Sequence, residues 1–217
     1  MTKHLQIDLD GLSKELLTMG AMVEEATNRS ITALVRRDKT LAREVIAVDD
    51  AINDCENRIE DHALKMLALH QPVAADLRFI ITVLKVNNDL ERIGDHAVSI
   101  AERAVVLADL EPVRRPEDFD RLVETVQQMM KASLTALVER DSALARKVCT
   151  MDDEVDRVHR LMYSAMQDVM RNDVRQIEPA VNTISATRHL ERIADLATNI
   201  AEDIVFMVEG EIVRHNY

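Results

Sequence analysis

The chain has 217 residues, of which 47% are apolar and only 2% are aromatic, and its formal net charge is −12. Four glycines and four prolines are too few for the many turns of a β-sandwich or for the glycine-rich loops of an α/β nucleotide-binding fold. The negative charge argues against nucleic acid as a partner and suits cations or basic patches on other proteins. The composition therefore predicts an all-α protein with long helices.

Apolar residues recur at spacings of three and four almost without interruption, which is the pattern of amphipathic helices. This spacing predicts six long helices, and Pro72 suits the first turn of the third, where its missing N–H costs nothing. The predicted ranges are 8–36, 39–69, 72–109, 116–140, 142–171 and 179–209. The segment "LEPVRRPED" at 110–118 holds two of the four prolines and is the predicted linker.

Two segments one hundred positions apart share most of their sequence. "LERIGDHAVSIAE" at 90–102 and "LERIADLATNIAE" at 190–202 agree at nine of thirteen positions. Further upstream, "VDDAIN" at 48–53 parallels "MDDEVD" at 151–156. We therefore predict a duplicated three-helix unit, with repeats at 1–112 and 113–217. Each repeat is short of core by itself, so the two are expected to pack along their lengths.

Each predicted repeat places oxygen-bearing side chains four residues apart on two neighbouring helices, so that they share one helix face. These residues are Asp49, Asn53, Glu91 and Asp95 in the first repeat, and Asp152, Asp156, Glu191 and Asp195 in the second. Carboxylates at this spacing repel each other by a few tenths of a kcal/mol on an isolated helix. A solvated acidic face is the plain explanation of one such pair, but repetition in both halves favours a cation site. Hard oxygen ligands favour Mg²⁺, Mn²⁺, Ca²⁺ or iron over Cu²⁺ and structural Zn²⁺.

Several other polar residues have an expected environment. His159 continues the line of Asp152 and Asp156 and is a candidate ligand, although a surface hydrogen bond explains it slightly better. Glu56 is its counterpart in the first repeat. His96 and His189 have no repeat partner and are expected to be exposed or paired with acids.

Cysteine usage and the absence of apolar runs predict where the protein resides. The two cysteines, Cys55 and Cys149, lie in helical patterns without metal-site spacing and are expected in the core, in a reducing compartment. The first residues lack the apolar stretch of a signal peptide, and no run of 18 apolar residues occurs. We therefore expect a cytoplasmic protein that does not insert into a membrane.

The chain resembles the PhoU family, the accessory and regulatory proteins of bacterial phosphate transport, over nearly its full length. The resemblance rests on an ordered set of segments: "TMGAMVEEA", "DDAIN", "HQPVAADLR", "LERIGD", "DDEVD" and "LERIAD". It implies two pseudo-symmetric three-helix bundles whose acidic motif pairs hold divalent or trivalent metal ions, with iron, manganese or magnesium as the candidates. The implied ligands are the eight residues named above. Asn53 would make the first site one charge weaker, and Ala194, where glycine is usual, would narrow the approach of a partner at the second.

The resemblance also implies a role. Members act between the ATPase subunit of the phosphate ABC transporter and a sensor histidine kinase, and they repress phosphate-starvation genes when phosphate is plentiful. It further implies a cytoplasmic homodimer that binds no nucleic acid and catalyses no reaction.

Two other classes of protein compete with this interpretation. A di-iron carboxylate enzyme needs Glu-x-x-His on each of two helices, and only the segment from Asp156 to His159 approaches that pattern. Since no P-loop, Gly-x-Ser-x-Gly or zincin motif occurs either, catalysis is not expected. A helical scaffold that binds a basic partner without metal is the second alternative. A bound cation that recruits phosphate is a third possibility, supported only by Arg92, Arg188 and Arg192.

Overall fold

A computed structural model of the chain describes residues 3–116 and 118–211; the outer ends of the two predicted repeats and Glu117 lie outside the described residues. The helices are α1 (Lys3–Arg36), α2 (Lys39–Ile46), α3 (Asp49–His70), α4 (Ala74–Ala108), α5 (Asp118–Glu139), α6 (Ser142–Cys149), α7 (Asp152–Asn172) and α8 (Ile177–Glu209), with a 3₁₀ turn, η1 (Val174–Gln176), before α8. Six of them have 21 to 35 residues, and the described residues contain no strand. The predicted all-α fold with six long helices is confirmed.

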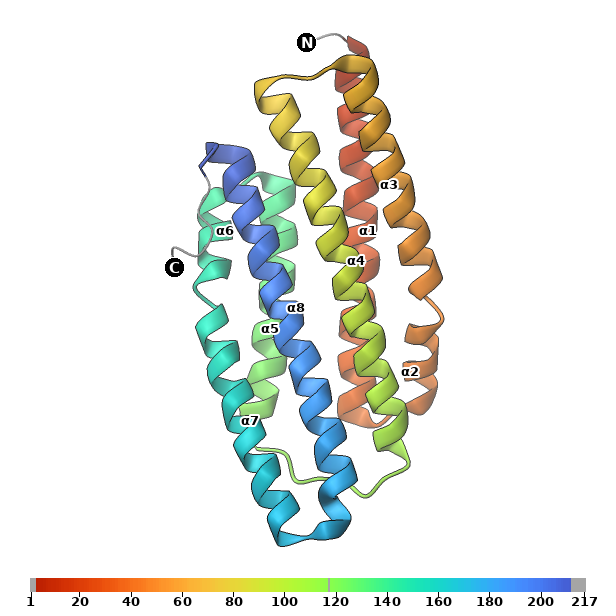
Figure 1. The fold of residues 1–217 in the computed structure, drawn as a ribbon, viewed down its shortest axis with the longest axis vertical. Coiled ribbons are helices and arrows are strands. Elements are labelled where there is room, and N and C mark those ends of the chain that lie inside the picture. Colours follow the sequence, from red (N-terminus) through yellow and green to blue (C-terminus); the bar gives the residue numbers. More distant parts are fainter. Residues whose placement is uncertain (1–2, 117, 212–217) are drawn as a thin grey trace.

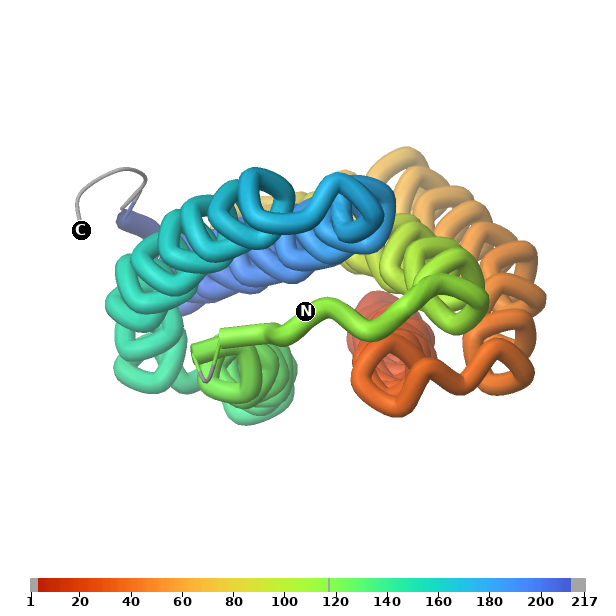
Figure 2. The backbone as a smooth tube through the Cα atoms, turned by 90° about the horizontal axis from the view of Figure 1, so that it is seen from below, coloured from red at the N-terminus to blue at the C-terminus, as the bar shows by residue number. Residues whose placement is uncertain are grey.

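The helices form two groups that lie side by side (Figure 1). One group holds α1–α4 and the other α5–α8, and the linker crosses from α4 to α5 at one end of the molecule (Figure 2). α4 and α8 run antiparallel and make the most extensive contacts between the groups, and α1 also touches α5. Buried side chains of both groups form one continuous core. The two halves therefore pack along their lengths, with the equivalent helices α4 and α8 running in opposite directions.

The prediction of unbroken helices over 39–69 and 142–171 was wrong. Both break at equivalent positions, after Ile46 and after Cys149, and a new helix begins after a gap of two residues. The residues preceding the second part, Val48 and Met151, stay in near-helical conformations, so the apolar spacing passes through the break unchanged. The break has a consequence for the acids, since it places Asp49 and Asp152 in the first turns of new helices, where the helix dipole favours negative charge.

The start of α4 also differs from the prediction. The helix begins at Ala74, so that Pro72 precedes the helix instead of lying in its first turn. Gln71 ends α3 in the left-handed conformation at φ 45°, and Ala74 follows at φ 51°. Two left-handed residues in one short connection reverse the chain before the helix can begin, which apolar spacing does not reveal.

The core shows why glycine and alanine differ between the halves. Ala194 is fully buried, so the expectation that it narrows a partner's approach to the second site was wrong. A Cβ added at Gly94 would lie 3.3 Å from Cδ1 and Cγ2 of Ile52. The equivalent of Ile52 in the second half is the smaller Val155. The methyl group that Ala194 adds on α8 is thus matched by the smaller side chain of Val155 on α7.

Two further expectations concern cysteines and membranes. Cys55 and Cys149 are buried and are not joined in a disulfide, which confirms their place in the core. Among the described helices, none is both long and apolar enough to cross a membrane.

Candidate metal centres

The first acidic set consists of Asp49 and Asn53 on α3 and Glu91 and Asp95 on α4. These helices are joined by residues 71–73 and pack together as an antiparallel pair. Asp49 and Asp95 are each 23 residues from position 72, and Asn53 and Glu91 are each 19 residues from it. Because both helices rise by about 1.5 Å per residue, the four side chains lie at two matching levels. The structure therefore brings the predicted residues of the first half together.

The first set concentrates negative charge in a partly buried place. Burial raises the pKa of Glu91, and the nearby charges of Asp95, Glu56 and Asp49 raise it further. Burial also raises the pKa of Asp95, as does Asp49. Asn53 donates from Nδ2 to Asp49 Oδ2 at 3.3 Å, while its Oδ1 is buried and accepts no hydrogen bond within the described chain. An unpaired carbonyl oxygen and carboxylates with raised pKa values thus lie in the same part of the α3–α4 pair.

The second acidic set, Asp152 and Asp156 on α7 with Glu191 and Asp195 on α8, repeats this register. Both cross-helix pairs are centred on the same point, between residues 173 and 174. Burial raises the pKa of Asp152 to about 6, with further contributions from Asp195, Asp156 and Glu191. The pKa values of Glu191 and Asp195 are raised as well, by burial first and then by neighbouring carboxylates.

Arginine partly neutralises the second set. Arg192 donates from Nη1 to Asp195 Oδ2 at 2.9 Å, and its Nε lies 3.5 Å from Glu191 Oε2. That Oε2 is buried and accepts no hydrogen bond. In the first half, Arg92 lies 3.6 Å from Asp89, outside the acidic set. The arginines therefore offset the carboxylate repulsion unequally, and in neither half do they remove the raised pKa values.

A fifth donor accompanies each set. His159 is close enough to Glu191 and Asp195 for its charge to lower their pKa values, against the dominant effect of burial. Its Nδ1 is buried, and nothing in the described part of the chain hydrogen-bonds to it. Glu56 holds the equivalent place in the first half, where burial and then Glu60 and Asp95 raise its pKa. The two sets therefore differ in chemistry, with a carboxylate in one half and an imidazole in the other.

His96 and His189 lie in a different environment from the one predicted. They face each other between α4 and α8, with Nδ1 atoms 3.3 Å apart and ring centroids separated by 5.3 Å. Burial lowers the pKa of both, that of His96 to about 4. The antiparallel packing of the two repeated helices brings them together, and a position in one repeat gives no sign of this contact.

The donors present fit a hard cation in both sets. Carboxylates that raise one another's pKa, with the buried and unpaired Asn53 Oδ1 and His159 Nδ1, are groups that a positive ion would stabilise. Within residues 3–116 and 118–211, no group of three or more acidic, His or Cys side chains is gathered tightly enough to form a ready-made metal site. A cation would therefore have to draw the carboxylates of a set together.

Comparisons with known proteins agree with this architecture. The profile of the PhoU domain matches residues 16–104 and again 119–204. A relative from Pseudomonas aeruginosa, named phosphate-specific transport system accessory protein PhoU homolog, is 38% identical over 99% of this chain and 89% of its own length. A relative of the same name from Aquifex aeolicus is 37% identical over 97% of this chain and 95% of its own length.

Two crystal structures share the fold. That of PhoU from Pseudomonas aeruginosa has a TM-score of 0.91 at 38% identity, covering 95% of this chain and 99% of its own. The second is the phosphate transport system regulatory protein PhoU from Streptococcus pneumoniae. Its TM-score is 0.88 at 27% identity, and the match covers 96% of this chain and 99% of that protein. The names describe accessory and regulatory proteins, not enzymes.

Proposed function

The chain belongs to the PhoU family, and we propose from this premise that it regulates phosphate uptake as an accessory protein of a phosphate transport system. The match over nearly the whole length of named relatives is the observation that carries the proposal. Its relatives are named as accessory and regulatory proteins, which supports a regulatory role and not an enzymatic one.

A finer proposal concerns partners. The protein acts in the cytoplasm, as a homodimer, between the ATPase subunit of a phosphate ABC transporter and a sensor histidine kinase. It keeps phosphate-starvation genes off when phosphate is plentiful. The family resemblance of the sequence supports this proposal, and the acidic surface of a chain with net charge −12 suits basic patches on such partners.

The chemical part of the proposal is that both acidic sets bind metal cations. Its support is the register described above, in which two pairs of oxygen donors meet at matching levels in each half. Asp49, Asn53, Glu91 and Asp95 would hold one centre, and Asp152, Asp156, Glu191 and Asp195 the other. Mg²⁺, Mn²⁺ and iron suit these oxygen donors. When bound, a cation would supply positive charge between α3 and α4, and between α7 and α8, at the level of the acidic sets.

A complementation experiment tests the regulatory role. The chain is expressed in a bacterium that lacks its own PhoU protein and carries a reporter driven by phosphate-starvation genes. We expect repression of the reporter in high phosphate. Reporter activity that stays as high as with an empty vector, at normal protein levels, would contradict the proposal.

The role of the cations is tested separately with Glu91→Gln and Glu191→Gln, which remove one charge from each set with little change in shape. Loss of repression with each variant is expected if cation binding is needed. A matched control is Glu25→Gln, because Glu25 is exposed on α1 outside both sets.

A scaffold that binds a basic partner without metal is the second candidate. The ion pairs of Arg192 with Glu191 and Asp195 favour it, since they show how a basic group can satisfy these acids. A chelator distinguishes the two candidates. A scaffold keeps its melting temperature when metal is removed, whereas a metal protein loses the stabilisation that its bound ligand provides.

A further inference from the structure

A groove of about 360 Å³, the α5–α6 groove, lies between α5 and α6 in the second half. Its apolar lining comes from both helices and from the junction before α7: Ala132, Leu144, Val148 and Met151. Lys131 on α5 and Lys147 on α6 line it as well, so that each helix contributes one lysine. No acidic side chain is among the described residues that line this groove.

The two lysines are a local exception to the charge of the chain, which is −12 in total. Both residues are exposed, and within the described part of the chain neither ammonium group has an ion-pair partner. An apolar groove with a free positive charge on each helix attracts acidic groups, whereas the net charge of the whole chain repels them.

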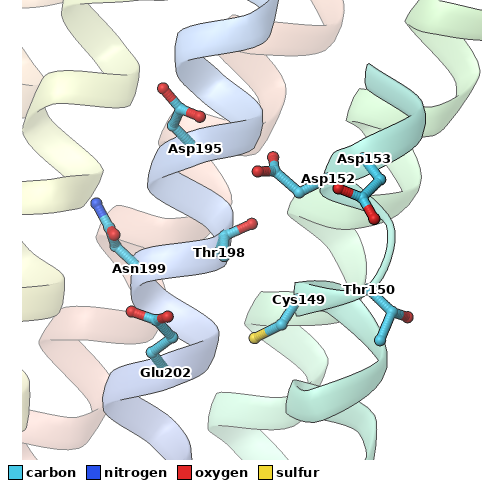
Figure 3. A pocket seen from close by; sticks show the side chains of 8 residues that line it. All are labelled: Cys149, Thr150, Asp152, Asp153, Asp195, Thr198, Asn199 and Glu202. Carbon is cyan, nitrogen blue, oxygen red and sulfur yellow. The ribbon is translucent and has the colours of Figure 1, made fainter. Parts of the chain in front are cut away.

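Another cavity near α6 has the opposite character. It has a volume of about 470 Å³, and Asp152, Asp153 and Asp195 point into it from α7 and α8 (Figure 3). Asp152 and Asp195 belong to the second acidic set, so this cavity is part of the site already described. The α5–α6 groove shares none of its lining residues, and its chemistry is therefore independent of the proposed metal centres.

The first half closes the equivalent place with an ion pair. Ala132 corresponds to Arg29 and Lys147 to Glu44, since both pairs are 103 positions apart, as are the helix starts at Lys39 and Ser142. Arg29 on α1 reaches across to α2 and donates from Nη2 to Glu44 Oε2. An arginine side chain therefore spans the two helices where alanine leaves space in the second half.

The exchange also reverses the charge of the shorter helix. In the first half a positive side chain lies over the helix pair, where its methylene groups can cover apolar surface, and the carboxylate of Glu44 holds it. In the second half the covering side chain is missing, and Lys147 replaces the carboxylate. The complementary cover for this groove is thus a negatively charged group that comes from outside the half.

We propose that the α5–α6 groove binds an amphipathic helix of a partner protein, with the partner's apolar side chains in the groove and its acidic side chains beside Lys131 and Lys147. A helix suits this place because the surface between two packed helices accepts side chains spaced three and four residues apart. The net charge of −12 disfavours an anionic membrane as the occupant. The inference goes beyond the proposed function, which assigns no surface to any partner.

Fluorescence anisotropy of a labelled synthetic peptide tests the inference. The peptide is a helix with leucines at spacings of three and four and glutamates on both flanks, and it is titrated with the full chain. One comparison peptide carries lysine in place of glutamate, and another carries serine in place of leucine. We expect the acidic peptide to bind one-to-one, and each comparison peptide to bind at least about tenfold more weakly. Absence of binding of the acidic peptide, or equal affinity for the acidic and basic peptides, would overturn the inference.

Two double variants use the first half as a template. Ala132→Arg with Lys147→Glu transfers the ion pair into the groove, and we expect peptide affinity to fall by at least about tenfold. Arg29→Ala with Glu44→Lys opens the equivalent place in the first half, and we expect a second bound peptide. Unchanged affinity in the first variant would overturn the inference, and a single bound peptide on the second would contradict the argument that the ion pair closes the first half. Circular dichroism confirms that both variants are folded.

The place of binding is measured with the methyl NMR signal of Met151, which Met151→Leu assigns. We expect the acidic peptide to shift this signal in the parent and not in Ala132→Arg with Lys147→Glu. Two other occupants give different results. Self-association of the parent that this double variant abolishes, or binding to phosphatidylserine vesicles, either one without peptide binding, would overturn the proposal of a partner helix.

The reporter experiment separates this inference from the proposed function. A parent that represses the reporter but binds no acidic peptide keeps the proposed function and loses the docking groove. A parent that binds the peptide at Met151 but does not repress keeps the groove and loses the proposed function.

Discussion

Replacing Asp152 by asparagine should stabilise the metal-free protein. Burial and the surrounding carboxylates raise the pKa of Asp152 from an ordinary 3.8 to about 6, so the charged form is disfavoured in the folded state. A tenfold change in proton affinity is about 1.4 kcal/mol, and the whole change is about 3 kcal/mol. Water screens part of this cost because the residue is partly exposed, and we expect a gain of about 1–2 kcal/mol at pH 7.5.

Urea denaturation in the presence of chelator measures this gain. The first-turn position of Asp152 in α7 also gives a favourable interaction with the helix dipole, worth about 0.3–1 kcal/mol, which the substitution removes. Asp153→Asn is the matched control, since it lies in the same turn but is exposed. We expect a higher urea midpoint for Asp152→Asn than for Asp153→Asn, and the reverse order would show that burial does not disfavour the charge of Asp152.

The same residue makes stability depend on pH in a known direction. A carboxyl group whose pKa is raised by folding takes up its proton in the folded state first. The contribution of Asp152 to folding stability is therefore greatest below about pH 4, where the carboxyl is protonated in both the folded and the unfolded chain. This contribution is lost as the pH rises through about 6, because the folded protein must then carry the buried charge. The metal-free parent should therefore gain stability between pH 7 and pH 5 relative to Asp152→Asn. Parallel pH profiles would contradict this assignment.

Three other predictions concern the packing of the halves and the choice of metal. Lys85→Met should destabilise the protein by about 2 kcal/mol, less than the loss expected for a fully buried ion pair. The reason is that Asp203, whose side chain is only 4% exposed, loses its ion pair with the lysine. An unchanged urea midpoint would show that this ion pair does not stabilise the fold. Gly94→Ala should be better tolerated when Ile52→Val is present, with a coupling of about 0.5–3 kcal/mol in a double-mutant cycle; strictly additive effects would rule out the compensating methyl. His159→Gln should weaken Zn²⁺ binding at the second set more than Mg²⁺ binding, since imidazole suits Zn²⁺, and equal losses in competition titrations would remove His159 as a ligand.

Apolar spacing and internal repetition carried the predictions that the sequence allowed. The spacing of apolar residues predicted six long helices, and the repeated "LERI" segments predicted two equivalent halves. The register of the acids followed from the same repeat, since Glu91 and Glu191 occupy equivalent places opposite Asn53 and Asp156. Which acids of two neighbouring antiparallel helices lie at the same level can be predicted once the turn that joins the helices is located.

Contacts between the halves could not be read in this way. His96 and His189 meet because α4 and α8 pack antiparallel, and neither local sequence contains that information. The breaks before Asp49 and Asp152 leave the apolar period intact, so periodicity does not register them.

The most direct test of the central claim is elemental analysis of the purified, untagged protein beside the double variant Glu91→Ala, Glu191→Ala. We predict stoichiometric manganese, iron or magnesium in the parent, lost in the variant at unchanged helical circular dichroism. Absence of metal from the parent after incubation with excess cation, or equal metal in both proteins, would contradict the claim that the two acidic sets are metal centres.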